Sequence, residues 1–180
     1  VHEDPRVRVV RLSIPEQAAL PLHARPRRVG GSLTANHVRL TRSDGTTSVT
    51  RTEAGTVAWS EPAVRSVANL GGRVENIVVE LKGAGAPAAP VAAPPRPSPP
   101  DYLDEPRHRW MFENQYVRVY DVRIPPGATT EIHHHAYDQL AVFVSGGQVA
   151  TQVDGQPWRP DDAIEPRHVE ATVEAFHYLQ

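Results

Sequence analysis

The sequence predicts an all-β protein built from two related units. Three observations lead to this prediction: segments in which apolar and polar residues alternate, a repeat of the segment at 6–14 in the segment at 116–124, and a stretch rich in proline and alanine between the copies. Alternation with a period of two places apolar side chains on one face of a strand. We therefore expect two β-domains, residues 1–82 and 101–180, joined by a linker over residues 83–100.

The first strand is expected over residues 6–14, which read Arg-Val-Arg-Val-Val-Arg-Leu-Ser-Ile. Residues 116–124 read Tyr-Val-Arg-Val-Tyr-Asp-Val-Arg-Ile, and a proline follows each segment. The offset between these two segments also separates His23 from His133, and the Asp-Gly pair at 44–45 from the pair at 154–155. The first of these pairs reads as a hairpin turn. A gap-free match of this kind indicates two copies of one unit.

Residues 83–100 contain seven prolines and six alanines. Because proline has no backbone N–H, this stretch cannot donate many hydrogen bonds to a sheet, and its composition offers little to a core. We interpret it as an extended, semi-rigid linker.

Composition excludes several classes of protein. The chain has 180 residues, of which 39% are apolar, and a formal net charge of -2. This balance predicts a soluble chain with neither nucleic acid nor a membrane as partner. No apolar run is long enough for a membrane helix, and the chain begins without a signal-peptide pattern. The absence of cysteine excludes disulfides and thiolate ligands but does not identify the compartment. Cytoplasm and periplasm both stay open, with the cytoplasm slightly preferred.

The most informative stretch is the histidine-rich segment that begins at Gly127. If it forms a strand, His133, His135 and Gln139 point to one face and His134 points to the other. Two neutral imidazoles on one face supply half of a four-coordinate shell for a divalent metal. The alternative is a polar surface strand or a loop in which the histidines have no common function.

This segment resembles the first motif of the cupin family, which is a Gly, five residues, His-x-His, three residues, Glu, six residues and a Gly. Gly127, His133, His135 and Gly146 are in register with the motif, and Gln139 stands where the family has Glu. The resemblance implies that each unit is a small antiparallel jelly-roll β-barrel. It also implies a divalent metal inside the mouth of the second barrel, with Fe, Mn, Ni, Zn and Cu all suited to histidine ligands.

The resemblance assigns the third metal-binding histidine of the second copy to His168. Gln139 would then be a weak fourth ligand or a hydrogen-bond donor to bound water or substrate. His177 is the rival for the third position, but we expect it to pack or to face solvent, because it lies between Phe176 and Tyr178 in the closing strand.

The first copy keeps the expected strands and lacks the metal ligands. His23 remains, whereas Arg25, Val29 and Arg65 stand where the resemblance places the second His, the Glu and the third His. Because arginine stays protonated and has no lone pair to donate, we expect no metal there. One interpretation is a barrel retained for packing. The other is that Arg25 and Arg65 face one another and hold a carboxylate or phosphate.

Four aromatic residues of the second copy are candidates for an apolar pocket around the metal: Tyr137, Phe143, Trp158 and Tyr178. Glu131 is a candidate general base, with a surface carboxylate as the alternative. The sequence identifies no residue that must be catalytic.

Two functions are consistent with these patterns. The first is a metal-dependent oxygenase or isomerase that acts on a small organic molecule. The alternative is a non-catalytic, small-molecule-binding or structural bicupin. Barrel edges often pair between subunits, so a homodimer is compatible with either function.

Overall fold

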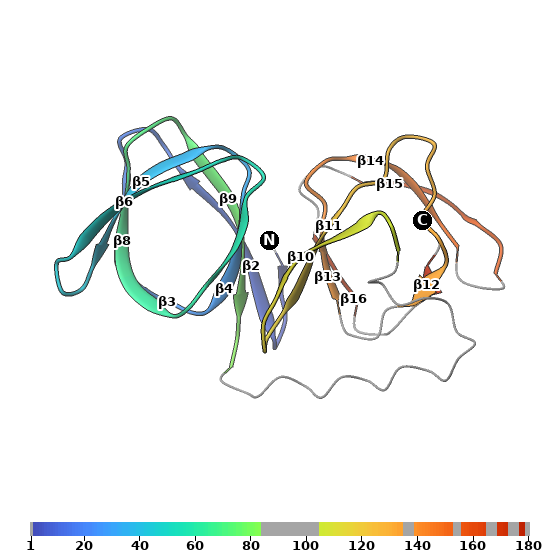
Figure 1. Cartoon of the computed structure of the whole chain (residues 1–180), viewed down its shortest axis with the longest axis horizontal. Coiled ribbons are helices and arrows are strands. Elements are labelled where there is room, and N and C mark those ends of the chain that lie inside the picture. Colours follow the sequence, from blue (N-terminus) through green and yellow to red (C-terminus); the bar gives the residue numbers. More distant parts are fainter. Residues whose placement is uncertain are drawn as a thin grey trace. The chain divides into compact units, whose positions relative to one another are not determined.

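The computed structural model describes residues 2–83, 105–134, 139–152, 156–164, 169–172 and 177–178. The chain divides into two compact units, Val1–Ala84 and Gly85–Gln180 (Figure 1). All regular structure in the described residues is β-strand, and every strand pairing is antiparallel. The predicted all-β fold class is therefore confirmed. The expected linker lies outside the described residues, apart from Gly83.

The first unit is built from two antiparallel sheets. Their strand orders are β1-β2-β9-β4-β7 and β3-β8-β5-β6. When the short β1 is left out and β2 to β9 are counted as strands one to eight, these orders become 1-8-3-6 and 2-7-4-5. This is the strand order of a jelly roll. The strands are β1 (His2–Glu3), β2 (Val7–Ile14), β3 (Ala19–Arg25), β4 (Arg28–Ser32), β5 (Asn36–Arg42), β6 (Thr47–Thr52), β7 (Val57–Ser60), β8 (Ala63–Asn69) and β9 (Val74–Leu81).

The core of the first unit lies between its two sheets. Ile14 and Val74 come from the first sheet, Val67 comes from the second, and all three are buried. Burial of each such side chain contributes about 1.5–3 kcal/mol. The partly buried residues packed against them are Leu12, Ala18, Leu20, Val38 and Leu40. One face of each sheet is thereby fixed as the inner face.

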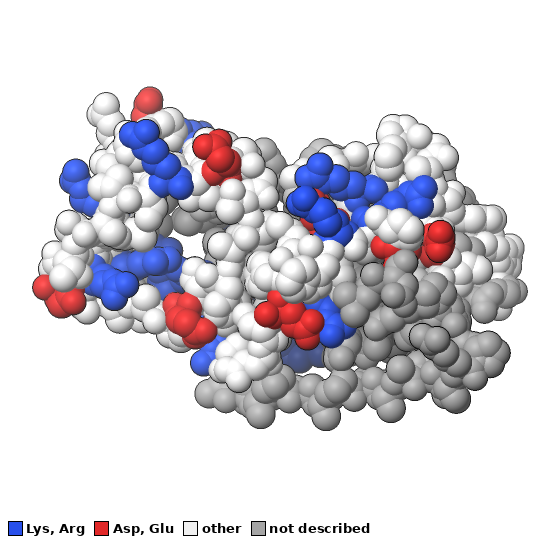
Figure 2. All heavy atoms as spheres, in the orientation of Figure 1, with Lys and Arg blue, Asp and Glu red and all other residues white. Residues whose placement is uncertain are grey.

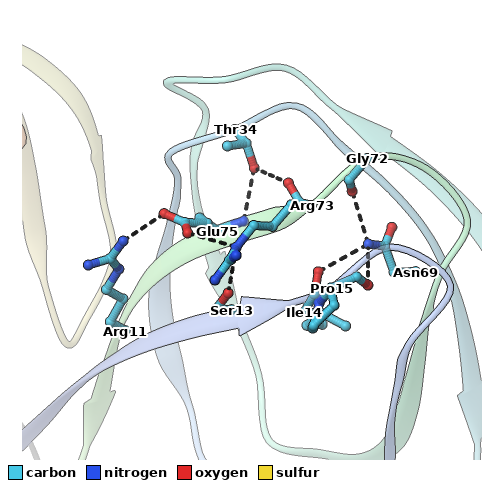
Figure 3. A network of polar contacts seen from close by, with 9 residues as sticks. All are labelled: Arg11, Ser13, Ile14, Pro15, Thr34, Asn69, Gly72, Arg73 and Glu75. Carbon is cyan, nitrogen blue, oxygen red and sulfur yellow. Dashed lines mark hydrogen bonds and ion pairs between the residues drawn. The ribbon is translucent and has the colours of Figure 1, made fainter.

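Polar contacts close the end of the first unit where β2, β8 and β9 meet (Figure 3). The Asn69 side chain is 3% exposed. Its Nδ2 donates to the carbonyl oxygens of Ile14, Pro15 and Gly72 at 3.1, 2.9 and 2.9 Å, and its Oδ1 accepts from the Gly71 amide at 3.0 Å. One side chain therefore bonds to backbone groups at the end of β2 and in the turn between β8 and β9.

Substitution of Asn69 should destabilise the first unit. We expect Asn69→Ala to lower the free energy of unfolding by about 2–4 kcal/mol, because it leaves buried backbone groups unpaired. Ser48→Ala, at an exposed position of β6, should change it by no more than about 0.5 kcal/mol. Urea unfolding in a Trp110→Phe, Trp158→Phe background, followed by the fluorescence of Trp59, measures both, and equal effects would contradict this role of Asn69.

The second unit consists of strand pairs in the described residues. β10 pairs with β11, β12 with β17, β13 with β16 and β14 with β15. The strands are β10 (His108–Glu113), β11 (Arg118–Val122), β12 (His133–His134), β13 (Gln139–Val142), β14 (Gly147–Thr151), β15 (Arg159–Ile164), β16 (Val169–Thr172) and β17 (His177–Tyr178).

Three of these pairings repeat those of the first unit in the same chain order. The pairs β12–β17, β13–β16 and β14–β15 correspond to β3–β8, β4–β7 and β5–β6. Within the described part of the second unit, no strand corresponds to β9. The matching pairings agree with the two copies expected from the sequence.

Local backbone geometry also recurs at the offset of the sequence repeat. The Asp4 carboxylate accepts from the amides two and three residues later at 2.6 and 2.8 Å. The Asn114 side-chain oxygen does the same at 2.8 and 3.0 Å. Gln17 and Gly127 both have positive φ, 59° and 76°. A non-glycine residue rarely adopts this conformation, so its recurrence at matched positions supports an internal repeat.

On the described part of the face in Figure 2, acidic and basic side chains are interspersed. This distribution accords with the small net charge of -2. In the ranges that the structure describes, no helix has the length and apolar character needed to cross a membrane.

Candidate metal centre

The candidate centre is built around His133, at the start of β12. Its side chain is 2% exposed, although the neighbouring Glu131 and Ile132 are exposed. The Nδ1 atom lies 2.7 Å from the carbonyl oxygen of Glu131. A carbonyl oxygen can only accept, so Nδ1 carries a proton, and in the neutral ring the lone pair is then on Nε2. This is the tautomer in which a histidine binds a metal through Nε2.

The same local bond occurs at the matching histidine of the first unit. His23 Nδ1 lies 2.8 Å from the carbonyl oxygen of Pro21, again two residues earlier. His23, however, is exposed. The backbone therefore orients both rings in the same way, and only the second unit buries the ring.

A second histidine, His108, packs against His133. It opens β10 and is 6% exposed. The centroids of the two rings are 4.7 Å apart and their planes cross at 61°, an edge-to-face contact. The Nδ1 atom of His108 forms a short hydrogen bond with the Glu105 carboxylate. His108 therefore limits the orientations open to the His133 ring.

Glu105 ties these parts together. It is 1% exposed and lies in the turn before β10. Its carboxylate accepts hydrogen bonds from the amide of Arg107 at 2.7 Å and from the amide of Glu131 at 3.1 Å, besides the bond from His108. The Arg107 guanidinium lies 3.6 Å away. A single carboxylate thus links the turn over residues 105–108 to the backbone just before His133.

The pKa values in this cluster indicate a carboxylate beside a neutral imidazole. Burial raises the pKa of Glu105, but the hydrogen bonds from His108, Glu131 and Arg107 outweigh this effect, so the pKa is lowered. Desolvation lowers the pKa of His108, and the opposing effect of the Glu105 carboxylate does not restore it. His108 is therefore neutral at pH 7.

The residues that the structure describes fit a metal in part. His133 presents the required tautomer, and Gln139 is half-buried at the start of β13. The predicted ligands His135 and His168 lie outside the described residues. Among the described residues, no three His, Cys, Asp or Glu side chains converge closely enough to hold an ion. Occupancy by a metal stays a prediction.

Strand pairing bears on the third histidine. In the first unit His23 pairs with Arg65 across β3 and β8. In the corresponding pair, β12 and β17, His133 pairs with Tyr178 and His134 pairs with His177. Val169, the residue after His168, instead pairs with Val142, three residues beyond Gln139 in β13. The pairing therefore brings the strand that carries His177 beside His133, while the sequence motif selects His168.

The predicted pocket residues are placed unevenly. Trp158 is 48% exposed, and Phe143 is half-buried. Tyr178 is opposite His133 in the β12–β17 pairing. Tyr137 lies outside the described residues. Glu131, the candidate general base, is exposed, and its backbone carbonyl accepts a hydrogen bond from His133. A pocket around the metal stays a prediction.

In the first unit, three arginines lie close enough to lower one another's pKa values. Desolvation and the positive charges of Arg65 and Arg25 lower the pKa of Arg28 to about 10. Desolvation, together with the neighbouring guanidinium of Arg65, lowers the pKa of Arg25. Desolvation and Arg42 lower the pKa of Arg65. The predicted pair, Arg25 and Arg65, is thus joined by Arg28.

Sequence reasoning missed three of these residues. Glu105 and His108 lie in the lead-in to the second copy, and the only signal is a Glu and a His three residues apart. Arg28 has no counterpart among the metal-binding positions of the motif, so the resemblance did not select it.

No protein-family model matches the sequence, and no curated protein matches it. Among solved structures, the chain is similar to a cupin domain from Bordetella pertussis Tohama I. The two share 18% sequence identity, with a TM-score of 0.43. The match covers 46% of this chain and 88% of the other.

Proposed function

We propose that the second unit is a cupin-type barrel that holds one divalent metal ion through His133, His135 and a third histidine. The observation that supports this most directly is the burial of His133 with its Nδ1 bonded to the Glu131 carbonyl. The tautomer so fixed has its lone pair on Nε2. The spacing of His133, His135 and Gln139 in the sequence supplies the rest of the proposed ligand set.

We further propose that the protein is a metal-dependent oxygenase or isomerase acting on a small organic acid, phenol or sugar. When bound, the ion would supply a Lewis acid or an oxygen-activating centre. The chain's own contribution is to hold the His133 ring through Glu105 and His108. Gln139 is neutral where the cupin motif has Glu, so the centre would keep more positive charge and favour an anionic substrate.

A non-catalytic binding protein is the second candidate. Gln139 favours it, because an amide oxygen is a weaker ligand than a carboxylate and leaves the ion less firmly held. Oxygen uptake with Fe(II) and candidate substrates separates the two functions. Uptake that depends on both metal and substrate supports an oxygenase, whereas isomerisation would be detected as product without oxygen consumption.

Metal stoichiometry tests the proposed centre. After dialysis of the full chain against Fe(II), Mn(II), Ni(II), Cu(II) or Zn(II) in turn, we expect one ion per chain for at least one metal, measured by elemental analysis. The arginines of the first unit cannot act as ligands, so two ions per chain would contradict this assignment. A protein that retains none of the five metals would refute the proposed centre.

The same assay identifies the third histidine. The cupin motif predicts that His168→Ala loses the ion and His177→Ala keeps it. The opposite result would require the β12–β17 pairing to shift by one residue, because in the observed register His177 is opposite His134 and Tyr178 is opposite His133. Tyr178→Phe completes the set of variants, because Tyr178 is the residue opposite His133 in the observed register, and a shift by one residue would put His177 in its place.

A further inference from the structure

Three arginines of the first unit lie on the inner faces of its sheets. Arg65 is two residues from the core residue Val67 in β8, so the two share a face. Arg25 pairs with Ala63 of the same strand and lies on that face as well. Arg28 of β4 pairs with Glu80 of β9. Glu80 is six residues from the core residue Val74 in the same strand, so Glu80 and Arg28 lie on the same face as Val74. All three therefore point toward the interior between the sheets.

These guanidiniums keep buried donors without acceptors. Arg28 is 5% exposed, and Arg25 and Arg65 are partly buried. Within the described residues, Nε and Nη2 of Arg25, Nη1 of Arg28 and Nε of Arg65 are buried and have no hydrogen-bond partner. A buried N–H without an acceptor is unfavourable, and it is more so when it belongs to a charged group.

The nearest negative charge does not balance the three positive charges. Glu80 is the carboxylate that raises the pKa of both Arg25 and Arg28, and in each case its effect is the smallest of those acting. The Glu80 carboxylate is already bonded to Arg8, whose Nε and Nη2 lie 2.9 and 2.8 Å from Oε2. Buried charges persist in proteins when they are paired, so this cluster lacks a counter-ion among the residues that the structure describes.

We propose that Arg25, Arg28 and Arg65 bind a small oxyanion that carries about two negative charges, such as a phosphate monoester or a dicarboxylate. Guanidinium forks bind such groups with paired, charge-assisted hydrogen bonds. A dianion offsets most of the positive charge that the three side chains gather, and its oxygens supply the missing acceptors. The site lies in the first unit and uses none of the residues proposed for the metal, so either site can fail without the other.

The test uses the full chain after dialysis against EDTA, so that an ion in the second unit cannot itself bind the probe. Inorganic phosphate and malonate are titrated by calorimetry, with chloride at equal ionic strength as control. We expect saturable binding of one probe or both, and the stronger one identifies the preferred group. No saturable binding of either probe would overturn the proposal.

Variants assign the binding to these residues. Arg28→Met and Arg25→Met should each weaken binding by roughly 10-fold or more, because each removes hydrogen bonds to a charged ligand. Arg39→Met makes the same change at an exposed position of β5 and should leave the affinity unchanged. Equal losses in Arg28→Met and Arg39→Met would show a non-specific charge effect and overturn the proposal.

The stability of the ligand-free variants distinguishes a binding site from structural arginines. Replacement of a buried, unpaired charge by a side chain of similar size is often neutral or stabilising. We therefore expect the unfolding temperature of ligand-free Arg28→Met to equal or exceed that of the wild type. Phosphate should raise the unfolding temperature of the wild type only. A marked fall in ligand-free Arg28→Met, with no effect of phosphate on the wild type, would mean that Arg28 serves packing alone.

Discussion

His133→Ala should lower the affinity of the second unit for its divalent metal by more than roughly 100-fold, the upper end of the range for residues that only position a ligand. The substitution removes the proposed Nε2 ligand itself. His133→Asn keeps a polar side chain and should lose the ion as well, because an amide does not replace the imidazole lone pair. Calorimetric titration and elemental analysis after dialysis both measure the loss.

The chain contains a matched control for this experiment. His23 occupies the same position in the first unit and makes the same bond to the carbonyl two residues before it. Because it is exposed and stands among arginines instead of histidines, His23→Ala should leave the metal content at the wild-type level. Retention of the ion by His133→Ala, or its loss in His23→Ala, would contradict the assignment.

Glu105→Ala should lower the free energy of unfolding of the second unit by about 2–4 kcal/mol, because a buried donor left without its acceptor costs roughly 1–3 kcal/mol. The substitution leaves His108 Nδ1 and the amides of Arg107 and Glu131 without their acceptor. Urea unfolding measures this loss in a Trp59→Phe background. There the fluorescence comes from Trp110 and Trp158, which both belong to the second unit.

Glu113→Ala is the control. Glu113 is an exposed carboxylate at the end of β10, and it pairs with Arg118 of β11 at 2.9 Å. A surface pair of this kind contributes no more than about 1 kcal/mol. If Glu105→Ala and Glu113→Ala had equal effects, the buried network would not support the second unit.

The acid sensitivity of the second unit should also depend on Glu105. Its pKa is lower in the folded than in the unfolded state, so its contribution to stability is complete above the unfolded pKa, about 4.3. That contribution is lost as the pH falls through the folded value. Glu105→Gln should therefore reduce the loss in free energy of unfolding that occurs below about pH 4. If the variant lost as much stability as the wild type over this pH range, Glu105 would not be ionised in the folded state.

The sequence was sufficient for features that depend on local chemistry. The Asp44-Gly45 turn was expected from residue type, and it joins β5 to β6 with Gly45 at a φ of 84°. The matched positions of the two copies agree with the paired geometry at Gln17 and Gly127. These features follow from backbone conformation, which short segments encode well.

The sequence was insufficient where a contact depends on tertiary packing. Glu105 and Glu131 are 26 residues apart, and nothing in either segment specifies that a carboxylate in one will accept from an amide in the other. The position of Arg28 also depends on tertiary packing, because only the register between β4 and β9 shows that its side chain points inward. The burial of both charged residues, which the sequence did not predict, is what makes them parts of a candidate site.

The most direct test of the proposed centre is an anomalous difference map from crystals of the full chain grown with Mn(II) or Co(II). The proposal predicts one strong peak in the second unit, about 2 Å from Nε2 of His133. It also predicts no peak beside His23 or between the arginines of the first unit. A peak in the first unit, or none at His133 with its ring turned away from the interior, would contradict the proposal.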